Sequence, residues 1–103
     1  MQDIEKTLVI FRMFKEEKEI IAIFPEEPGN YDSNTCSSYV HVGQHGTCDP
    51  QYLIQDATYP AYPFQYQDLK EELEKMGYNL VIKKKYQSKH YETRQKSLKQ
   101  MGE

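Results

Sequence analysis

Two apolar runs near the start of the chain decide its fold: Thr7-Leu-Val-Ile-Phe-Arg-Met-Phe14 and Glu19-Ile-Ile-Ala-Ile-Phe24. Both are rich in β-branched and aromatic residues, which favour strands. The polar stretch between them, residues 15–18, has the length of a hairpin turn. The sequence therefore predicts a β-hairpin. Pro25 is expected to end its second strand, because proline has no N–H to donate to the sheet.

A helix is predicted to begin at Pro63, because proline suits the first position of a helix. Four residues then form an apolar stripe at helical spacing: Tyr66, Leu69, Leu73 and Met76. Gly77 is expected to end the helix in a left-handed conformation. Residues 78–86 predict a strand after it.

These elements predict one α+β domain over residues 1–86, with a mostly antiparallel four- or five-stranded sheet and one helix packed on one face. A third strand is expected at about 38–42, and residues 51–55 are a candidate fourth. A length of 103 residues fits a single domain. Residues 87–103 have a basic character and no convincing apolar stripe, so this tail is expected to be frayed or disordered.

The N-terminus does not have the pattern of a signal peptide, since acidic residues come early and no long apolar core follows. The longest apolar-rich run, residues 20–24, is too short to span a bilayer. The sequence therefore predicts a cytoplasmic protein that does not associate with a membrane. In such a compartment Cys36 and Cys48 are expected to be thiols rather than a bridge, and whether they pair, bind metal or stay free is left open.

The midsection from Cys36 to Cys48 holds both cysteines and two of the three histidines. Under the two-residue period of a strand, Val40 and Val42 face one way, as core, and the side chains next to them face outward or into a cleft. Gly43 and Gly46 then help to form a polar rim that suits a partner. The predicted binding residues are Tyr39, His41, Gln44 and His45.

Two enzymatic interpretations of the same segment stay open. Cys36, His41, His45 and Cys48 are side chains of the kind that zinc takes. In an extended strand, however, the two histidines lie about 13 Å apart, so one ion reaches both only if the chain folds back. The second interpretation is a nucleophilic cysteine activated by one of these histidines. No common enzyme signature accompanies them, and no cofactor is predicted.

The net charge of −3 is distributed unevenly along the chain. From Lys83 onward seven basic residues accompany two acidic ones, whereas residues 1–82 are acidic overall. Basic residues mixed with aromatic ones are typical of nucleic-acid binders, and the candidates here are Lys83, Lys84, Lys85 and Arg94. Because the acidic body repels phosphate, a solvated strand end and tail is the simpler interpretation.

Several stretches together resemble a small uncharacterised family: Val9-Ile-Phe-Arg-Met-Phe14, Ile21-Ala-Ile-Phe-Pro25, Tyr39-Val-His-Val-Gly-Gln-His-Gly46, Asp68-Leu-Lys-Glu-Glu-Leu73 and Gly77-Tyr-Asn-Leu80. This family consists of small single-domain proteins of gut bacteria, their phages and mobile elements. The Tyr-x-His-x-Gly-Gln-His segment is its most specific part. The resemblance covers about residues 7–86 and brings no known activity; it implies a cytosolic accessory protein.

The sequence as a whole predicts a small non-enzymatic binding or regulatory protein that contacts an unknown protein partner through residues 25–48. A metal-dependent or Cys/His-dependent enzyme and nucleic-acid association through residues 83–94 are the alternatives. Exposed edges of a small sheet also leave a homodimer open.

Overall fold

A computed structural model describes residues 6–29, 34–40 and 45–101 of the chain. Its strands are β1 (Lys6–Phe14), β2 (Ile20–Pro28), β3 (Cys36–Tyr39), β4 (His45–Cys48), β5 (Thr58–Pro60) and β6 (Asn79–Ile82). Its helices are α1 (Pro50–Tyr52), which continues into a π-helical turn η1 (Leu53–Ala57), α2 (Pro63–Lys75) and α3 (Ser88–Met101). The α+β class predicted from the sequence is confirmed.

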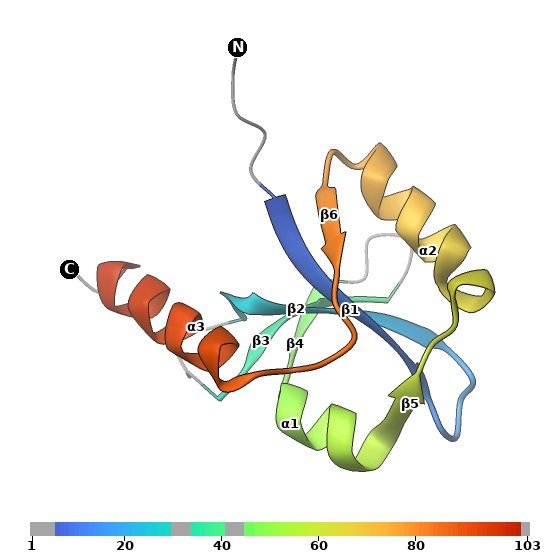
Figure 1. Ribbon diagram of the computed structural model, residues 1–103, viewed down its shortest axis with the longest axis horizontal. Helices are drawn as coiled ribbons and strands as arrows, with labels where there is room; N and C mark the ends of the chain where they lie inside the picture. Colours follow the sequence, from blue (N-terminus) through green and yellow to red (C-terminus); the bar gives the residue numbers. More distant parts are fainter. Residues whose placement is uncertain (1–5, 30–33, 41–44, 102–103) are drawn as a thin grey trace.

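The six strands form one mixed sheet in which β4, β3, β2 and β1 are antiparallel neighbours (Figure 1). The other edge of β1 is shared by two short strands. β6 pairs in parallel with its first half, and β5 pairs antiparallel with its last three residues. The prediction of a mostly antiparallel sheet therefore holds only in outline, because the strand after α2 returns in the same direction as β1.

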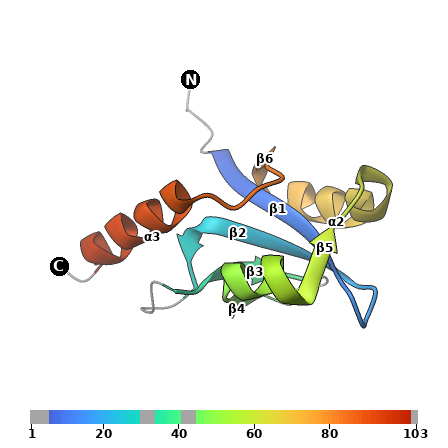
Figure 2. The same cartoon turned by 60° about the horizontal axis from the view of Figure 1, so that its bottom comes forward.

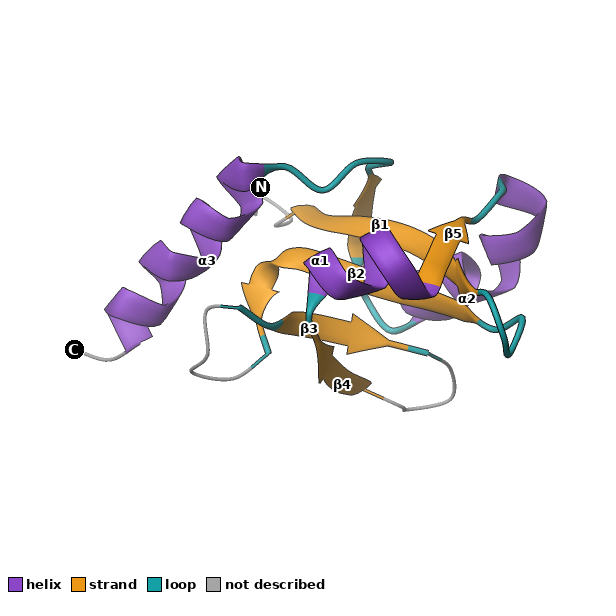
Figure 3. Ribbon diagram, turned by 90° about the horizontal axis from the view of Figure 1, so that it is seen from below, coloured by secondary structure: helices purple, strands orange, loops and turns teal. Residues whose placement is uncertain are grey.

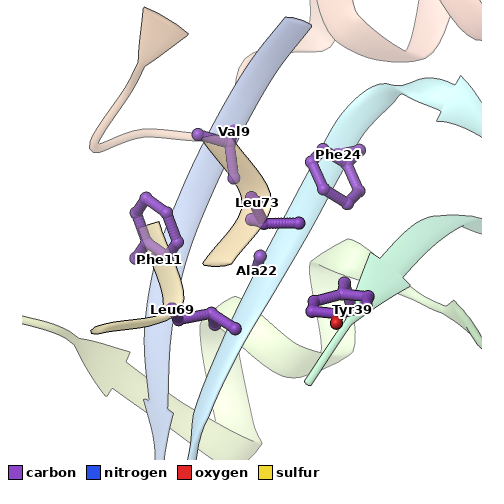
Figure 4. Packing of buried hydrophobic residues seen from close by; sticks show 7 residues of the cluster. All are labelled: Val9, Phe11, Ala22, Phe24, Tyr39, Leu69 and Leu73. Carbon is purple, nitrogen blue, oxygen red and sulfur yellow. The ribbon is translucent and has the colours of Figure 1, made fainter. Parts of the chain in front are cut away.

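Helix α2 covers one face of the sheet with a compact apolar core. Figure 4 shows the side chains that form it, contributed by three strands and by α2: Val9, Phe11, Ala22, Phe24, Tyr39, Leu69 and Leu73. The helix begins at Pro63 and is followed by Gly77 at a φ of +107°, both as predicted. Of the predicted stripe, Leu69 and Leu73 are buried, whereas Met76 is exposed.

The opposite face is covered by α1 and η1, which Figure 3 shows lying across the strands. Leu53 packs there against Ile10, Ile21 and Ile23. Residues 51–55 were a candidate strand, and this prediction was wrong. Asp49 caps the helix by accepting hydrogen bonds from the backbone N–H groups of residues 51 and 52, and a proline follows it.

The second strand of the hairpin does not end at Pro25, in contrast to the prediction. β2 runs on to Pro28, with an irregular register between Phe24 and Pro28 where it pairs with β3. Because the pairing is irregular there, Pro25 does not need to donate a backbone hydrogen bond to β3, which a proline cannot do. Pro25 is buried, and its carbonyl becomes an attachment point for the C-terminal helix.

Residues 88–101 form helix α3, where the sequence predicted a frayed or disordered tail, so the chain has more than the single helix expected. Figures 1 and 2 show α3 beside the end of β2, at one side of the sheet. Two polar side chains attach it. Arg94 Nη1 donates to the Pro25 carbonyl over 2.6 Å, and His90 Nδ1 lies 2.9 Å from Glu26 Oε2. The sequence shows no apolar stripe for this helix, because its most buried side chains are a cation and an imidazole.

Arg94 is 1% exposed and His90 is equally buried. The guanidinium lies 5.5 Å from the ring centres of both Tyr86 and Tyr91, a distance at which cation–π attraction operates. Along the described ranges, no helix is sufficiently long and apolar to cross a membrane.

Candidate functional site

The predicted binding residues of the midsection are not all at the surface. Tyr39 is 1% exposed, lies in the core under α2, and donates its hydroxyl hydrogen to Glu72. Its predicted outward position was wrong, because both sides of this segment are covered. Tyr39 lies in the core under α2, and Val40, the residue after β3, packs against the cluster around Leu53 on the opposite face. His45 is exposed, and His41 and Gln44 lie outside the described residues.

The two cysteines face each other across neighbouring strands. Cys36 of β3 is the direct register partner of Cys48 of β4, and their sulfur atoms lie 3.6 Å apart without a covalent bond. Cys36 is fully buried and Cys48 is half-buried. Both side chains belong to the face covered by α1 and η1.

His45 is not a partner for either thiol. Its ring packs edge-on against Tyr39, with the ring centres 4.7 Å apart, and residues three apart in a strand point to opposite faces. Within the described ranges there is also no group of three or more histidine, cysteine, aspartate or glutamate side chains that would hold a metal ion. His41, which both enzymatic interpretations use, lies outside the described residues.

The two thiols have opposite electrostatic environments. The hydrogen bond between the sulfurs, followed by burial, raises the pKa of Cys36. The same hydrogen bond lowers the pKa of Cys48, and a further hydrogen bond from Ser38 acts in the same direction against the effect of burial. Cys48 is thus the thiol that ionises first.

An exposed aromatic pair marks a different part of the surface, at the start of α2. Phe64 is 80% exposed and Tyr62 is 63% exposed. Their rings are stacked, with centres 5.9 Å apart and planes inclined by 6°. Pro63, at the first position of the helix, separates the two residues. Large apolar side chains this exposed are a common mark of an interaction site when they gather in one place.

A groove of about 190 Å³ lies beside this aromatic pair. We call it the aromatic groove, and it is lined by apolar and aromatic residues, with two lysines: Phe11, Pro60, Ala61, Tyr62, Pro63, Tyr66, Ile82, Lys83 and Lys84. The parallel pairing of β6 with β1 builds it, because this pairing brings Ile82 and the lysines that follow it next to Phe11 and the start of α2. No acidic side chain is among these lining residues.

The same lysines border a second hollow of about 280 Å³, here called the lysine hollow. It is lined by Lys83, Lys84, Lys85, Gln87, Lys89 and His90. The aromatic groove and the lysine hollow share Lys83 and Lys84, so an apolar surface passes directly into a cationic one. The backbone N–H of Lys83 donates to the Val9 carbonyl over 2.8 Å and fixes this junction to the sheet.

The basic segment singled out from the sequence is therefore divided by the fold. Lys83, Lys84 and Lys85 are exposed at the lysine hollow. Arg94 is inside the molecule, where it holds α3 to Pro25. Phe64 and Tyr62 were not among the residues predicted to be functional. The available signal was that Phe64 lies outside the apolar stripe of its own helix.

Comparison of the chain with protein-family models, curated proteins and solved structures finds no match. The resemblance to the small gut-bacterial and phage family stays a prediction.

Proposed function

We propose that this protein is a non-enzymatic binding module whose partner is a protein that presents an acidic, extended segment with an apolar anchor side chain. The segment docks on the aromatic groove and the lysine hollow. The observation that carries this proposal is the 80% exposure of Phe64, whose ring stacks on Tyr62, a residue that lines an apolar groove bordered by exposed lysines.

The apolar anchor supplies most of the binding free energy. A side chain such as leucine or phenylalanine enters the aromatic groove, where it contacts Phe11, Pro60 and Ile82. Burying such a side chain contributes about 1.5–3 kcal/mol. Aromatic residues that are already stacked lose little conformational freedom on binding, and such residues are frequent among those that dominate interface energetics.

The lysines supply orientation and partner choice. Lys83, Lys84, Lys85 and Lys89 gather at one hollow of a chain whose net charge is −3. Carboxylates next to the anchor reach these ammonium groups, whereas a basic segment is repelled from them. Charge complementarity of this kind accelerates association and rejects wrong partners more than it raises affinity.

A protein segment fits this surface better than single-stranded nucleic acid does. The apolar lining from Pro60 and Ala61 to Ile82 suits an aliphatic side chain, and the cation Arg94 is used inside the fold rather than at the surface. The lysines of the hollow come from a short stretch, residues 83–89, whereas nucleic-acid grooves follow the phosphate backbone over several nucleotides.

The sequence predicted a docking surface at residues 25–48. In that region Tyr39 has a structural role, and His45 is the described candidate that is exposed. The two locations give opposite predictions for substitutions, so one experiment separates them.

The test is a selection of random peptides displayed on phage against the full chain. We expect enrichment of peptides that combine acidic residues with one large apolar residue. Their binding is expected to weaken as salt is added and to be lost in both Phe64→Ala and Lys84→Glu. His45→Ala is the matched control, because it changes an exposed residue on β4, away from the groove, and should bind the same peptides.

Three results would overturn the proposal. Selected peptides that bind Phe64→Ala as well as the native chain would show that the aromatic groove is not the site. Loss of binding in His45→Ala alone would place the site at residues 25–48. Salt-sensitive binding of a fluorescent oligothymidylate that Lys84→Glu abolishes, with no peptide enriched, would show that the partner is nucleic acid.

A further inference from the structure

The two cysteines have the geometry of a pair that reacts together. Register partners in antiparallel strands have Cα atoms about 4.5–5.5 Å apart, which is within the about 4.4–6.8 Å range of disulfide-bonded cysteines. Cys36 and Cys48 are such partners, and their sulfurs are already 3.6 Å apart. The strands therefore need no separation or slippage, and small side-chain rotations bring the sulfurs to bonding distance.

We propose that Cys36 and Cys48 are a reversible redox modification site, at which a low-molecular-weight disulfide such as oxidised glutathione converts the thiol pair into an intrachain disulfide. This site is on the face covered by α1 and η1 and is independent of the aromatic groove.

The reaction has two exchange steps. The Cys48 thiolate attacks one sulfur of oxidised glutathione, so a mixed disulfide forms at Cys48 and one glutathione thiolate leaves, taking up the proton from Cys48. Cys36 then attacks the Cys48 sulfur, the bond between Cys48 and glutathione breaks, and the departing second glutathione thiolate takes up the proton that Cys36 loses. In total the two cysteines lose two electrons and two protons, and one oxidised glutathione becomes two reduced glutathiones.

The order of attack follows from exposure and ionisation. Cys48 is the more exposed of the two thiols, and its hydrogen bonds from Cys36 and Ser38 favour the thiolate. Asp49, the residue next to Cys48, is among the residues that line a hollow of about 400 Å³ between α1 and α3. Cys36 is fully buried, so it is reached only by the neighbouring sulfur and acts as the resolving thiol.

The disulfide ties the edge strand β4 to β3, and β4 is otherwise held only by its pairing with β3 among the described strands. A cross-link between residues distant in sequence restricts the unfolded chain and raises the unfolding temperature. We therefore expect the oxidised protein to unfold at a higher temperature than the reduced protein, and the reduced value to return on adding dithiothreitol.

The test treats the full native chain with oxidised glutathione, alkylates the remaining thiols and determines the intact mass. We expect the loss of two hydrogens, no alkylated cysteine and no retained glutathione, with a digest fragment that joins residues 36 and 48. Cys36→Ser should keep one glutathione at Cys48, whereas Cys48→Ser should acquire almost none while it is folded.

Two outcomes would overturn the proposal. One is a native chain that keeps both thiols free at an oxidant concentration that oxidises the urea-unfolded chain. The other is a native chain that accumulates glutathione adducts without the cross-link. Neither outcome bears on peptide binding at the aromatic groove. If a serine variant fails to fold, the native chain alone decides the question.

Discussion

The midsection of the chain and the start of α2 both present aromatic residues, but the fold uses them in opposite ways. Tyr39 of β3 is 1% exposed, in the core under α2, and its hydroxyl contacts Glu72. Phe64 is 80% exposed and stacks only at the rim of the molecule, on Tyr62. An aromatic side chain that the core needs is a poor candidate for function. One that the core leaves exposed beside a groove is a better candidate.

The contrast predicts that Tyr39→Ala has the largest effect on stability. Removing a fully buried ring leaves a cavity in the core under α2 and costs about 3–5 kcal/mol in the free energy of unfolding. Urea unfolding followed by circular dichroism measures this change. Tyr39→Phe is the control, since it keeps the ring and removes the hydroxyl that donates to the Glu72 carboxylate, and a hydrogen bond to a charged group is worth about 1.5–3 kcal/mol. A smaller loss in the free energy of unfolding for Tyr39→Ala than for Tyr39→Phe would contradict the structural role given to this ring.

Arg94 and Lys84 extend the comparison from aromatic residues to cations. Arg94→Met leaves the buried Pro25 carbonyl without its donor, at a cost of about 1–3 kcal/mol. Because this contact holds α3 rather than the sheet, the backbone amides of residues 88–101 should exchange with deuterium faster while those of α2 keep their protection. Lys84→Met, at the exposed lysine hollow, is the matched control and should change neither exchange pattern. Equal loosening of α2 and α3 in Arg94→Met would contradict the local role given to Arg94.

The elements that could be predicted from the sequence are those whose signals are local. The hairpin follows from two dense apolar runs, and α2 follows from Pro63, Gly77 and a stripe of leucines. These signals act between neighbouring residues, so they favour the same conformation in the isolated segment and in the folded chain. The α+β class was accessible for the same reason.

The remaining elements depend on contacts between distant residues. Helix α3 is attached by Arg94 and His90 to a carbonyl and a carboxylate of β2, which no apolar periodicity reveals. The burial of Tyr39 depends on α2 lying above it. The two-residue period separates the side chains of the two faces of β3, but it does not show that both faces are covered. The aromatic groove exists only because β6 pairs in parallel with β1.

The measurement that tests the account most directly is the stability of Phe64→Ala together with its affinity for the peptides selected on the native chain. Since this ring is at the surface, its removal should change the free energy of unfolding by less than about 0.5 kcal/mol. The same substitution should abolish peptide binding. A variant that binds like the native chain, or one that is destabilised as much as Tyr39→Ala, would contradict the claim that the exposed aromatic pair is there for a partner.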